Sequence, residues 1–169
     1  MSNKEDKTNV MRMLDQKKIP YTPHGYEHEG DEPVDALSVA EKTGIPIEQI
    51  YKTLVTRGAS GGYFVFVVPG GASLDLKKAA KAAGEKSIAM IKVSDLLPLT
   101  GYIRGGCSPI GMKKPFPTWF DESALGQKTI SVSGGRIGKQ VEAAPTDLIR
   151  MANAKIADLC SEEKTEEEQ

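Results

Sequence analysis

The loop GYIRGGCSPIG, residues 101–111, is where residue types and spacing most clearly allow chemistry. It combines four glycines and one proline with Cys107, a side chain that could act as a nucleophile. A cysteine attacks as its thiolate, which a neighbouring base or cation must stabilise. No histidine lies near Cys107 in the sequence. The pattern therefore favours a small, semi-buried side chain in a tight loop over a catalytic thiol. The glycines would also allow a cradle of backbone N–H groups.

The two histidines, His24 and His28, are four positions apart, which is the spacing of a metal-binding pair on a helix. Pro23 and Gly25 disfavour a helix in this segment. In an extended segment the two histidines would lie about 13 Å apart, too far to share an ion. We therefore interpret them as surface or core residues and expect no metal site.

Lys52 lies in the run IYKTLV, which predicts a β-strand. Alternation along the strand would give Lys52 the same face as Ile50 and Leu54, which look core-facing. An inward lysine is costly unless a ligand or partner meets its charge. The alternative register turns Lys52 to solvent, and the pattern alone leaves both open.

The segment SVSGGRIGKQVE contains a glycine-rich turn between two alternating β runs. A phosphate-binding loop leads into a helix, whereas a strand follows here. A hairpin turn at Gly134 and Gly135 is therefore the better interpretation. Ser133, at the end of the first run, could still reach a ligand.

Short helices and strands are expected to position these residues. Helical spacing, Gly44, Gly84 and Pro145 predict helices over 8–18, 34–44, 75–84 and 145–160, the last with Leu148, Ala152, Ile156 and Leu159 on one face. Apolar β runs predict strands over 49–57, 62–70, 87–91, 116–121, 128–133 and 139–143, the first two forming a hairpin. This irregular order predicts an α+β fold with a mixed, strongly curved, barrel-like sheet flanked by helices.

Length and composition are consistent with one domain over residues 1–160. The chain has 169 residues, 39% of them hydrophobic, and no apolar run near the ~20 residues of a membrane helix. The charged N-terminus lacks a signal-peptide core, and the two cysteines form no CxxC pair. We expect a cytoplasmic protein in a reducing compartment.

Charge is distributed unevenly along the chain. Residues 50–160 carry 15 Lys and Arg against 8 Asp and Glu, whereas residues 1–49 carry 6 against 10. The terminal segment 161–169 carries one against five and is expected to be a disordered acidic tail. The basic middle allows an anionic partner such as a nucleic acid, although solvated surface lysines are the simpler explanation of the charge alone.

The chain resembles the YbaK/EbsC family in a set of motifs that occur in the same order: YEH, IYKTL, LDLKKAAKAAG, TGYIRGGCSPIGMKK, ISVSGG and AAPTDLIRMANAKIADL. This family is related to the editing domain inserted in bacterial prolyl-tRNA synthetases. The resemblance covers residues 8–160 and implies the family's barrel-like α+β fold. It also implies hydrolysis of mischarged tRNA, with Cys-tRNA(Pro) as the first candidate substrate. Ala-tRNA or Ser-tRNA editing, and a non-catalytic tRNA- or nucleotide-binding module, remain alternatives.

The same resemblance implies a set of site residues. In the family, a GxxxP loop lines the aminoacyl pocket and acts through its backbone N–H groups, and the essential lysine corresponds to Lys52. The implied catalytic residues are Lys52, Gly105 and Gly106; the implied substrate-binding residues are Tyr26, Thr53, Cys107, Ser108, Pro109, Ser133, Gly134 and Gln140. Gln140 stands where the best-known members carry an aspartate, so a role that needs a carboxylate there is in doubt.

The implied chemistry needs no metal and no cofactor. An aminoacyl ester is labile, so orientation and stabilisation of developing negative charge suffice. For a cysteinyl ester the family mechanism uses the substrate's own thiol as the nucleophile. The expected partner is the 3′ end of tRNA(Pro), a partnership with prolyl-tRNA synthetase is also open, and no membrane is involved.

Overall fold

The computed structural model describes residues 7–161, so most of the predicted acidic tail lies outside the described residues. Its helices are α1 (Asn9–Gln16), α2 (Ala36–Thr43), α3 (Leu76–Ala83), α4 (Val93–Thr100) and α5 (Pro145–Met151), with 3-10 turns η2 (Ile47–Gln49) and η3 (Glu122–Gly126). Its strands are β1 (Thr22–Gly25), β2 (Tyr51–Gly58), β3 (Tyr63–Pro69), β4 (Ile88–Met90), β5 (Thr118–Asp121), β6 (Ile130–Ser133), β7 (Lys139–Ala143) and β8 (Lys155–Ala157). Among residues 7–161, no helix is long and apolar enough to cross a membrane.

Local sequence signals set the ends of the predicted helices. The Thr8 hydroxyl accepts a hydrogen bond from the Met11 N–H and caps α1, and the Asp75 carboxylate caps α3 in the same way. Gly44 and Gly84 end α2 and α3 in the left-handed conformation that glycine adopts at low cost. These helix boundaries are confirmed.

The strands form two sheets, one of order β1-β7-β6 and one of order β4-β2-β3-β5-β8. The first is antiparallel, whereas β3, β5 and β8 run parallel in the second, so the predicted mixed α+β fold is confirmed. A parallel bridge between Ile50 and Ser131 joins the two sheets. Among residues 7–161 the paired strands do not close into a complete barrel.

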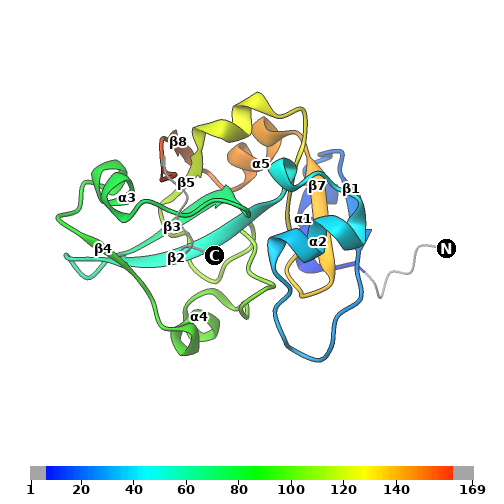
Figure 1. Cartoon of the computed structure of the whole chain (residues 1–169), viewed down its shortest axis with the longest axis horizontal. Helices are drawn as coiled ribbons and strands as arrows, with labels where there is room; N and C mark the ends of the chain where they lie inside the picture. Colours follow the sequence, from blue (N-terminus) through cyan, green and yellow to red (C-terminus); the bar gives the residue numbers. More distant parts are fainter. Residues whose placement is uncertain (1–6, 162–169) are drawn as a thin grey trace.

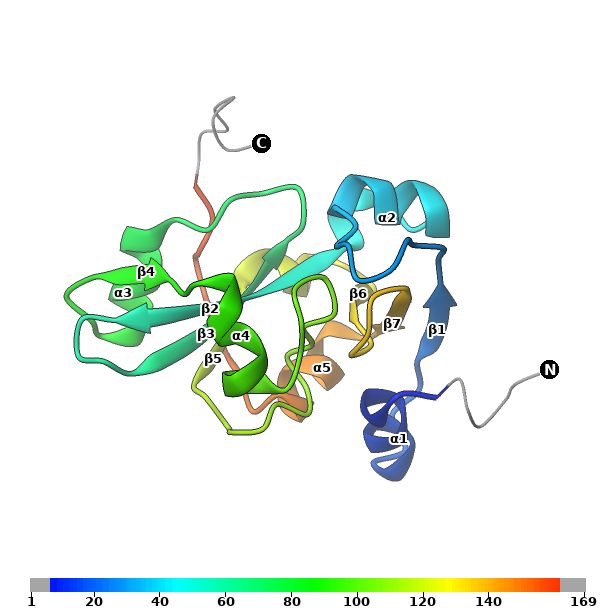
Figure 2. The same ribbon diagram turned by 90° about the horizontal axis from the view of Figure 1, so that it is seen from below.

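The two sheets share one apolar core on what we call the inner face. Tyr51 and Val67 from the second sheet pack there with Val132 and Val141 from the first, and α1 contributes Leu14. The opposite, outer face is covered by α3, which packs on Phe66 and Val68, and by α2, which packs on Ile50. Figure 1 accordingly shows α3 and α4 on opposite sides of the β2–β3 hairpin. In Figure 2 the sheet of β1, β7 and β6 lies between α1 and α2.

The C-terminal segment differs from the prediction of one helix over 145–160. Helix α5 ends at Met151, Asn153 adopts a positive φ of 51°, and β8 then pairs in parallel with β5. Ile156 is 41% exposed although the predicted apolar face included it. Apolar residues keep a helical spacing beyond Met151, but the backbone there is extended. Pairing with β5, which is distant in the sequence, therefore outweighs the local helical pattern.

Helix α4 was not predicted. Its sequence VSDLLPLT contains Pro98, which normally argues against a helix. The helix packs through Leu96 on Val55 and Val65 of the inner face, and Gly101 ends it with a φ of 86°. Packing against the sheet therefore outweighs the weak local preference.

Candidate active site

Lys52 lies on the outer face of β2. It is opposite Val68 in β3, and its neighbour Leu54 is opposite Phe66, both of which belong to the core beneath α3. The register in which Lys52 shares a face with Ile50 and Leu54 is therefore confirmed. The ammonium donates a hydrogen bond of 3.3 Å to the Gly70 carbonyl. Burial lowers the pKa of Lys52, and the nearby Cys160 partly offsets this effect.

Ser133 and Gln140 lie on the same outer face as Lys52. They are directly opposite each other in the β6–β7 pair, and both are buried. The Ser131 hydroxyl donates to the Gln140 side-chain carbonyl at 2.7 Å, and Ser131 is bridged to Ile50, two residues before Lys52. The Ser133 hydroxyl accepts from the Gly135 N–H at 3.1 Å, as expected for a tight hairpin turn. These contacts gather polar groups beside the start of β2.

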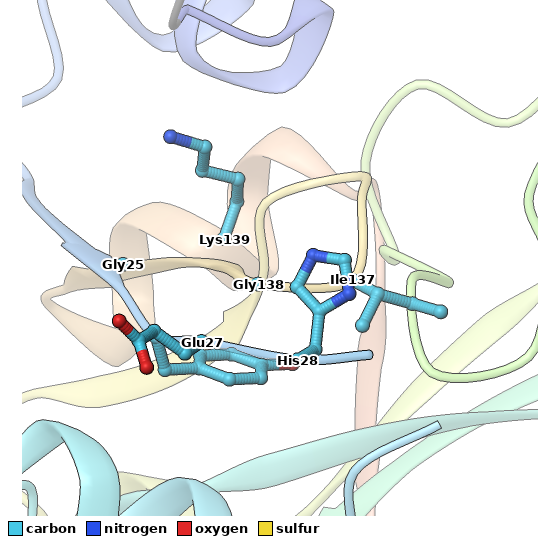
Figure 3. Close-up of a pocket in the computed structure, with 7 residues that line it drawn as sticks. Gly25, Glu27, His28, Ile137, Gly138 and Lys139 are labelled. Atoms are coloured by element: carbon cyan, nitrogen blue, oxygen red, sulfur yellow. The ribbon is translucent and has the colours of Figure 1, made fainter. Parts of the chain in front are cut away.

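Tyr26 continues this face beyond the end of β1. Its N–H donates to the Gly138 carbonyl at 3.0 Å, and its ring packs against the α2 cluster that contains Ile50. Tyr26 also lines an open hollow of about 440 Å³, together with Gly25, Glu27, His28, Ile137, Gly138 and Lys139 (Figure 3). Of the predicted site residues, Tyr26 alone is among the residues that line this hollow.

The predicted catalytic loop, residues 105–109, is tightly packed. Gly105 has a φ of +88°, and a Cβ built on it would lie 2.9 Å from the Pro33 Cβ. A Cβ on Gly106 would lie 3.0 Å from the Ile137 nitrogen. The glycines therefore allow close approach of the β1–α2 segment and the β6–β7 turn. Neither Pro33 nor Ile137 could be predicted as part of the site, because their contacts with the loop are long-range and no local sequence pattern marks them.

Some backbone N–H groups of this loop form hydrogen bonds within the protein and others do not. The Gly106 N–H donates to the Ile103 carbonyl at 2.9 Å and closes a turn, so it is already occupied. Among residues 7–161, no hydrogen bond involves the N–H of Cys107 or Ser108 as donor. These two amides therefore lack a hydrogen-bond partner among the described residues, and both residues are buried, with Cys107 8% and Ser108 0% exposed.

Cys107 packs on the inner face with Val55 and Val65 and is 8% exposed. Burial raises the pKa of its thiol to about 12, with a smaller opposing effect of a hydrogen bond to Thr100. The thiol is therefore protonated at neutral pH, which is the state of an inert structural cysteine.

Thr53 also faces inward, because it lies opposite Val67 in the hairpin register. Its Oγ1 is buried and has no hydrogen-bond partner among residues 7–161. The structure thus places Lys52, Ser133, Gln140 and Tyr26 on one face, and Thr53 and Cys107 on the other. Pro33 and Ile137 link the loop of residues 105–109 to the first group.

The histidines are not brought together as a metal pair. His24 Nε2 lies 2.8 Å from Glu142 Oε1, whereas His28 Nδ1 hydrogen bonds the Gly30 carbonyl at 2.9 Å. Within the described part of the chain, no group of three or more His, Cys, Asp or Glu side chains could hold a metal ion.

Comparison with known proteins relates the chain to tRNA-editing proteins. Residues 31–151 match the family described as "Aminoacyl-tRNA editing domain". The chain is 47% identical to EbsC of Enterococcus faecalis over 94% of its own length and 96% of that protein, whose name proposes it as a Cys-tRNA(Pro)/Cys-tRNA(Cys) deacylase. It is also 32% identical, over 59% of its length, to 17% of a proline–tRNA ligase of Fervidobacterium nodosum.

The fold agrees with these sequence relationships. A crystal structure described as a proposed trans-editing enzyme for prolyl-tRNA synthetase superposes with a TM-score of 0.76 and 27% identity. The superposition covers 91% of this chain and 98% of the other.

Proposed function

Because the chain belongs to the aminoacyl-tRNA editing domain family, we propose that it is a trans-editing hydrolase that deacylates mischarged tRNA, with Cys-tRNA(Pro) as its substrate. The resemblance to EbsC across nearly the whole chain supports this substrate. The observation that carries the proposal is the partly buried ammonium of Lys52, which donates to the Gly70 carbonyl and lies on the same face as Ser133 and Gln140. The ion pairs found within residues 7–161 do not include Lys52.

An unpaired lysine in this setting suits an anionic ligand. Burial disfavours its charge, so a negative group that binds beside it would recover that cost. In an aminoacyl-tRNA such groups are the phosphates and the oxyanion that develops when the ester carbonyl is attacked. Lys52 would therefore stabilise bound substrate, the transition state, or both.

The loop of residues 105–109 would hold the ester carbonyl. The N–H groups of Cys107 and Ser108 would be the donors, because that of Gly106 is used within the loop. Both residues are buried, so the loop would have to shift for both amides to reach the ester oxygen. Two adjacent amides directed at one oxygen are a common way to stabilise an oxyanion. In this account Gly105 and Gly106 act by allowing the loop to pack, and Cys107 contributes its backbone.

The substrate thiol would be the nucleophile. Its sulfur attacks the ester carbonyl carbon, a C–S bond forms, and the bond from that carbon to the ribose 3′-oxygen breaks. The thiol proton is transferred to the departing 3′-oxygen, which leaves tRNA with a free hydroxyl and a four-membered cyclic thioester of cysteine. Water then opens this ring to give free cysteine. The protonated, buried thiol of Cys107 takes no part in these steps.

Deacylation assays with the purified protein test this function. Cys-tRNA(Pro), Ala-tRNA(Pro) and Ser-tRNA(Pro) are incubated with the wild type, with Lys52→Ala and with Lys81→Ala, a matched control at an exposed lysine of α3. We expect turnover of Cys-tRNA(Pro) that Lys52→Ala abolishes and Lys81→Ala retains. Binding of all three without turnover would instead identify a non-catalytic module.

A further inference from the structure

We propose that the hollow beside Tyr26 binds the 3′-terminal nucleotide of the RNA, with the His28 ring against the base and Lys139 at its phosphate. This inference rests on the proposed function and deepens it, since it adds His28, Lys139 and Glu27 to the site. The volume of about 440 Å³ falls within the range of about 300–1,000 Å³ typical of small-ligand sites.

The residues that line the hollow supply the groups that a nucleotide needs. The rings of Tyr26 and His28 meet edge to face with centroids 6.5 Å apart, and Ile137 adds an apolar surface. Bases stack on such rings whatever their sequence. The ammonium of Lys139 suits one phosphate, and the carboxylate of Glu27 can accept hydrogen bonds from ribose hydroxyls. Figure 3 shows the Lys139 and His28 side chains extending to the same side of the turn.

The His28 ring is held in a defined position. A Cβ on Gly138 would lie 2.6 Å from the His28 Cδ2, so the absence of a side chain at Gly138 makes room for the ring. A carbonyl only accepts hydrogen bonds, so Nδ1 donates to Gly30, and Nε2 of the neutral ring remains an acceptor. That acceptor suits the exocyclic amino group of adenine or cytosine.

The hollow lies next to the expected position of the ester. Ile137 lines the hollow, and its backbone nitrogen is also the atom nearest to a Cβ on Gly106. In an aminoacyl-tRNA the amino acid is attached to the ribose of the terminal nucleotide. A nucleotide in the hollow would therefore carry its aminoacyl group directly towards the loop of residues 105–109.

Charges around the hollow limit what it can bind. Glu27, Glu29, Asp31 and Glu32 are exposed on the segment that forms one wall. These carboxylates would repel a continuous phosphate backbone, whereas a chain end brings a single phosphate to Lys139. The charges therefore favour binding of a terminal nucleotide over binding of an internal segment of single-stranded or double-stranded RNA.

Binding of adenosine 5′-monophosphate and of adenosine, measured by titration calorimetry, tests the site without any turnover. The variants are Lys139→Met and His28→Ala, with Lys155→Met in exposed β8 as the matched control, and melting curves check folding. We expect His28→Ala to weaken both ligands about tenfold, consistent with loss of base stacking. Lys139→Met should weaken only the monophosphate, and Lys155→Met should bind both ligands like the wild type.

Steady-state deacylation separates this inference from the proposed function. With Cys-tRNA(Pro), Lys139→Met should raise KM severalfold, leave kcat within about twofold and reduce the salt dependence of KM by about one ion. Turnover with unchanged KM in Lys139→Met and unchanged ligand binding in both variants would overturn the nucleotide site and leave the enzyme assignment intact. Nucleotide binding at these residues without turnover would support the site and refute the hydrolase.

Discussion

Pro33 packs directly against Gly105, so that a Cβ on Gly105 would lie 2.9 Å from the Pro33 Cβ. The same β1–α2 segment contacts Gly138 through Tyr26 and His28, and Ala36, the first residue of α2, lies against Gly70. Gly70 in turn accepts the hydrogen bond from Lys52. This one segment therefore connects the predicted catalytic lysine, the glycine loop and the nucleotide hollow, and its packing should control activity.

Gly106→Ala should reduce both stability and deacylation. The new methyl group would lie 3.0–3.1 Å from backbone atoms of Arg136 and Ile137, so the β6–β7 turn or the loop must shift. Overpacking of this kind typically costs about 1–3 kcal/mol. Gly126→Ala is the matched control, because a Cβ there meets nothing within 4 Å. Urea unfolding measures the loss of stability, and kcat/KM measures the loss of deacylation. If Gly106→Ala and Gly126→Ala had the same stability and the same kcat/KM, the close packing around Gly106 would be contradicted.

Lys52→Met should remove activity and leave the fold intact or more stable. The lysine makes one hydrogen bond to Gly70 and no ion pair within the described residues, and burial penalises its charge. Loss of an electrostatic donor to a transition state costs about 10²–10³ in rate. Thermal melts and single-turnover rates test this prediction, with Lys81→Met as the control. A variant that melts early would show instead that Lys52 is a structural residue.

Thr53→Val should stabilise the protein because it replaces a buried hydroxyl that has no partner. An unsatisfied buried polar group costs about 1–3 kcal/mol, and valine has nearly the same shape as threonine. If substrate uses this hydroxyl, kcat/KM should fall while the unfolding free energy rises. Chemical denaturation and deacylation rates distinguish the two effects. A decrease in stability would mean that the hydroxyl is satisfied in solution.

Cys107→Ala should retain most of the deacylase activity, since the proposed role of this residue is carried by its N–H. The variant should also change the alkaline stability profile. Burial raises the pKa of the folded thiol from 9.0 to about 12. The stability that this thiol contributes is present below the unfolded pKa and is lost as pH rises towards the folded value. Urea midpoints between pH 8 and 11 should fall less steeply for Cys107→Ala than for the wild type. Loss of turnover in this variant would restore the cysteine as a candidate nucleophile.

Most elements could be predicted because their signals are local. Thr8 and Asp75 cap helices, Gly44 and Gly84 end them, and the apolar β2 and β3 runs form the expected hairpin. Strand β8 could not be predicted, since it depends on parallel pairing with β5, which is distant in the sequence. Helix α4 depends similarly on packing against Val55 and Val65.

In the candidate site too, features that depend on local sequence could be predicted, whereas features that depend on long-range contacts could not. The strand pattern left open whether Lys52 faces the core or solvent, and only its pairing with Val68, which lies in the core beneath α3, decides the register. The glycines of the loop of residues 105–109 are evident in the sequence. The reason that glycine is needed there is not, because it depends on close contacts with Pro33 and Ile137, which are distant in the sequence. The occupied N–H of Gly106 likewise depends on a turn geometry that composition does not reveal.

The ratio of deacylation rates for Cys-tRNA(Pro) and Ser-tRNA(Pro) shows whether the substrate thiol or water is the nucleophile. The two substrates differ by one atom, and a binding pocket alone separates such similar groups by roughly 10–200-fold. If the substrate thiol is the nucleophile, the cysteinyl ester should be cleaved more than about a thousandfold faster, well beyond that range. Comparable rates for the two esters would contradict the account, because water would then have to be the nucleophile for both.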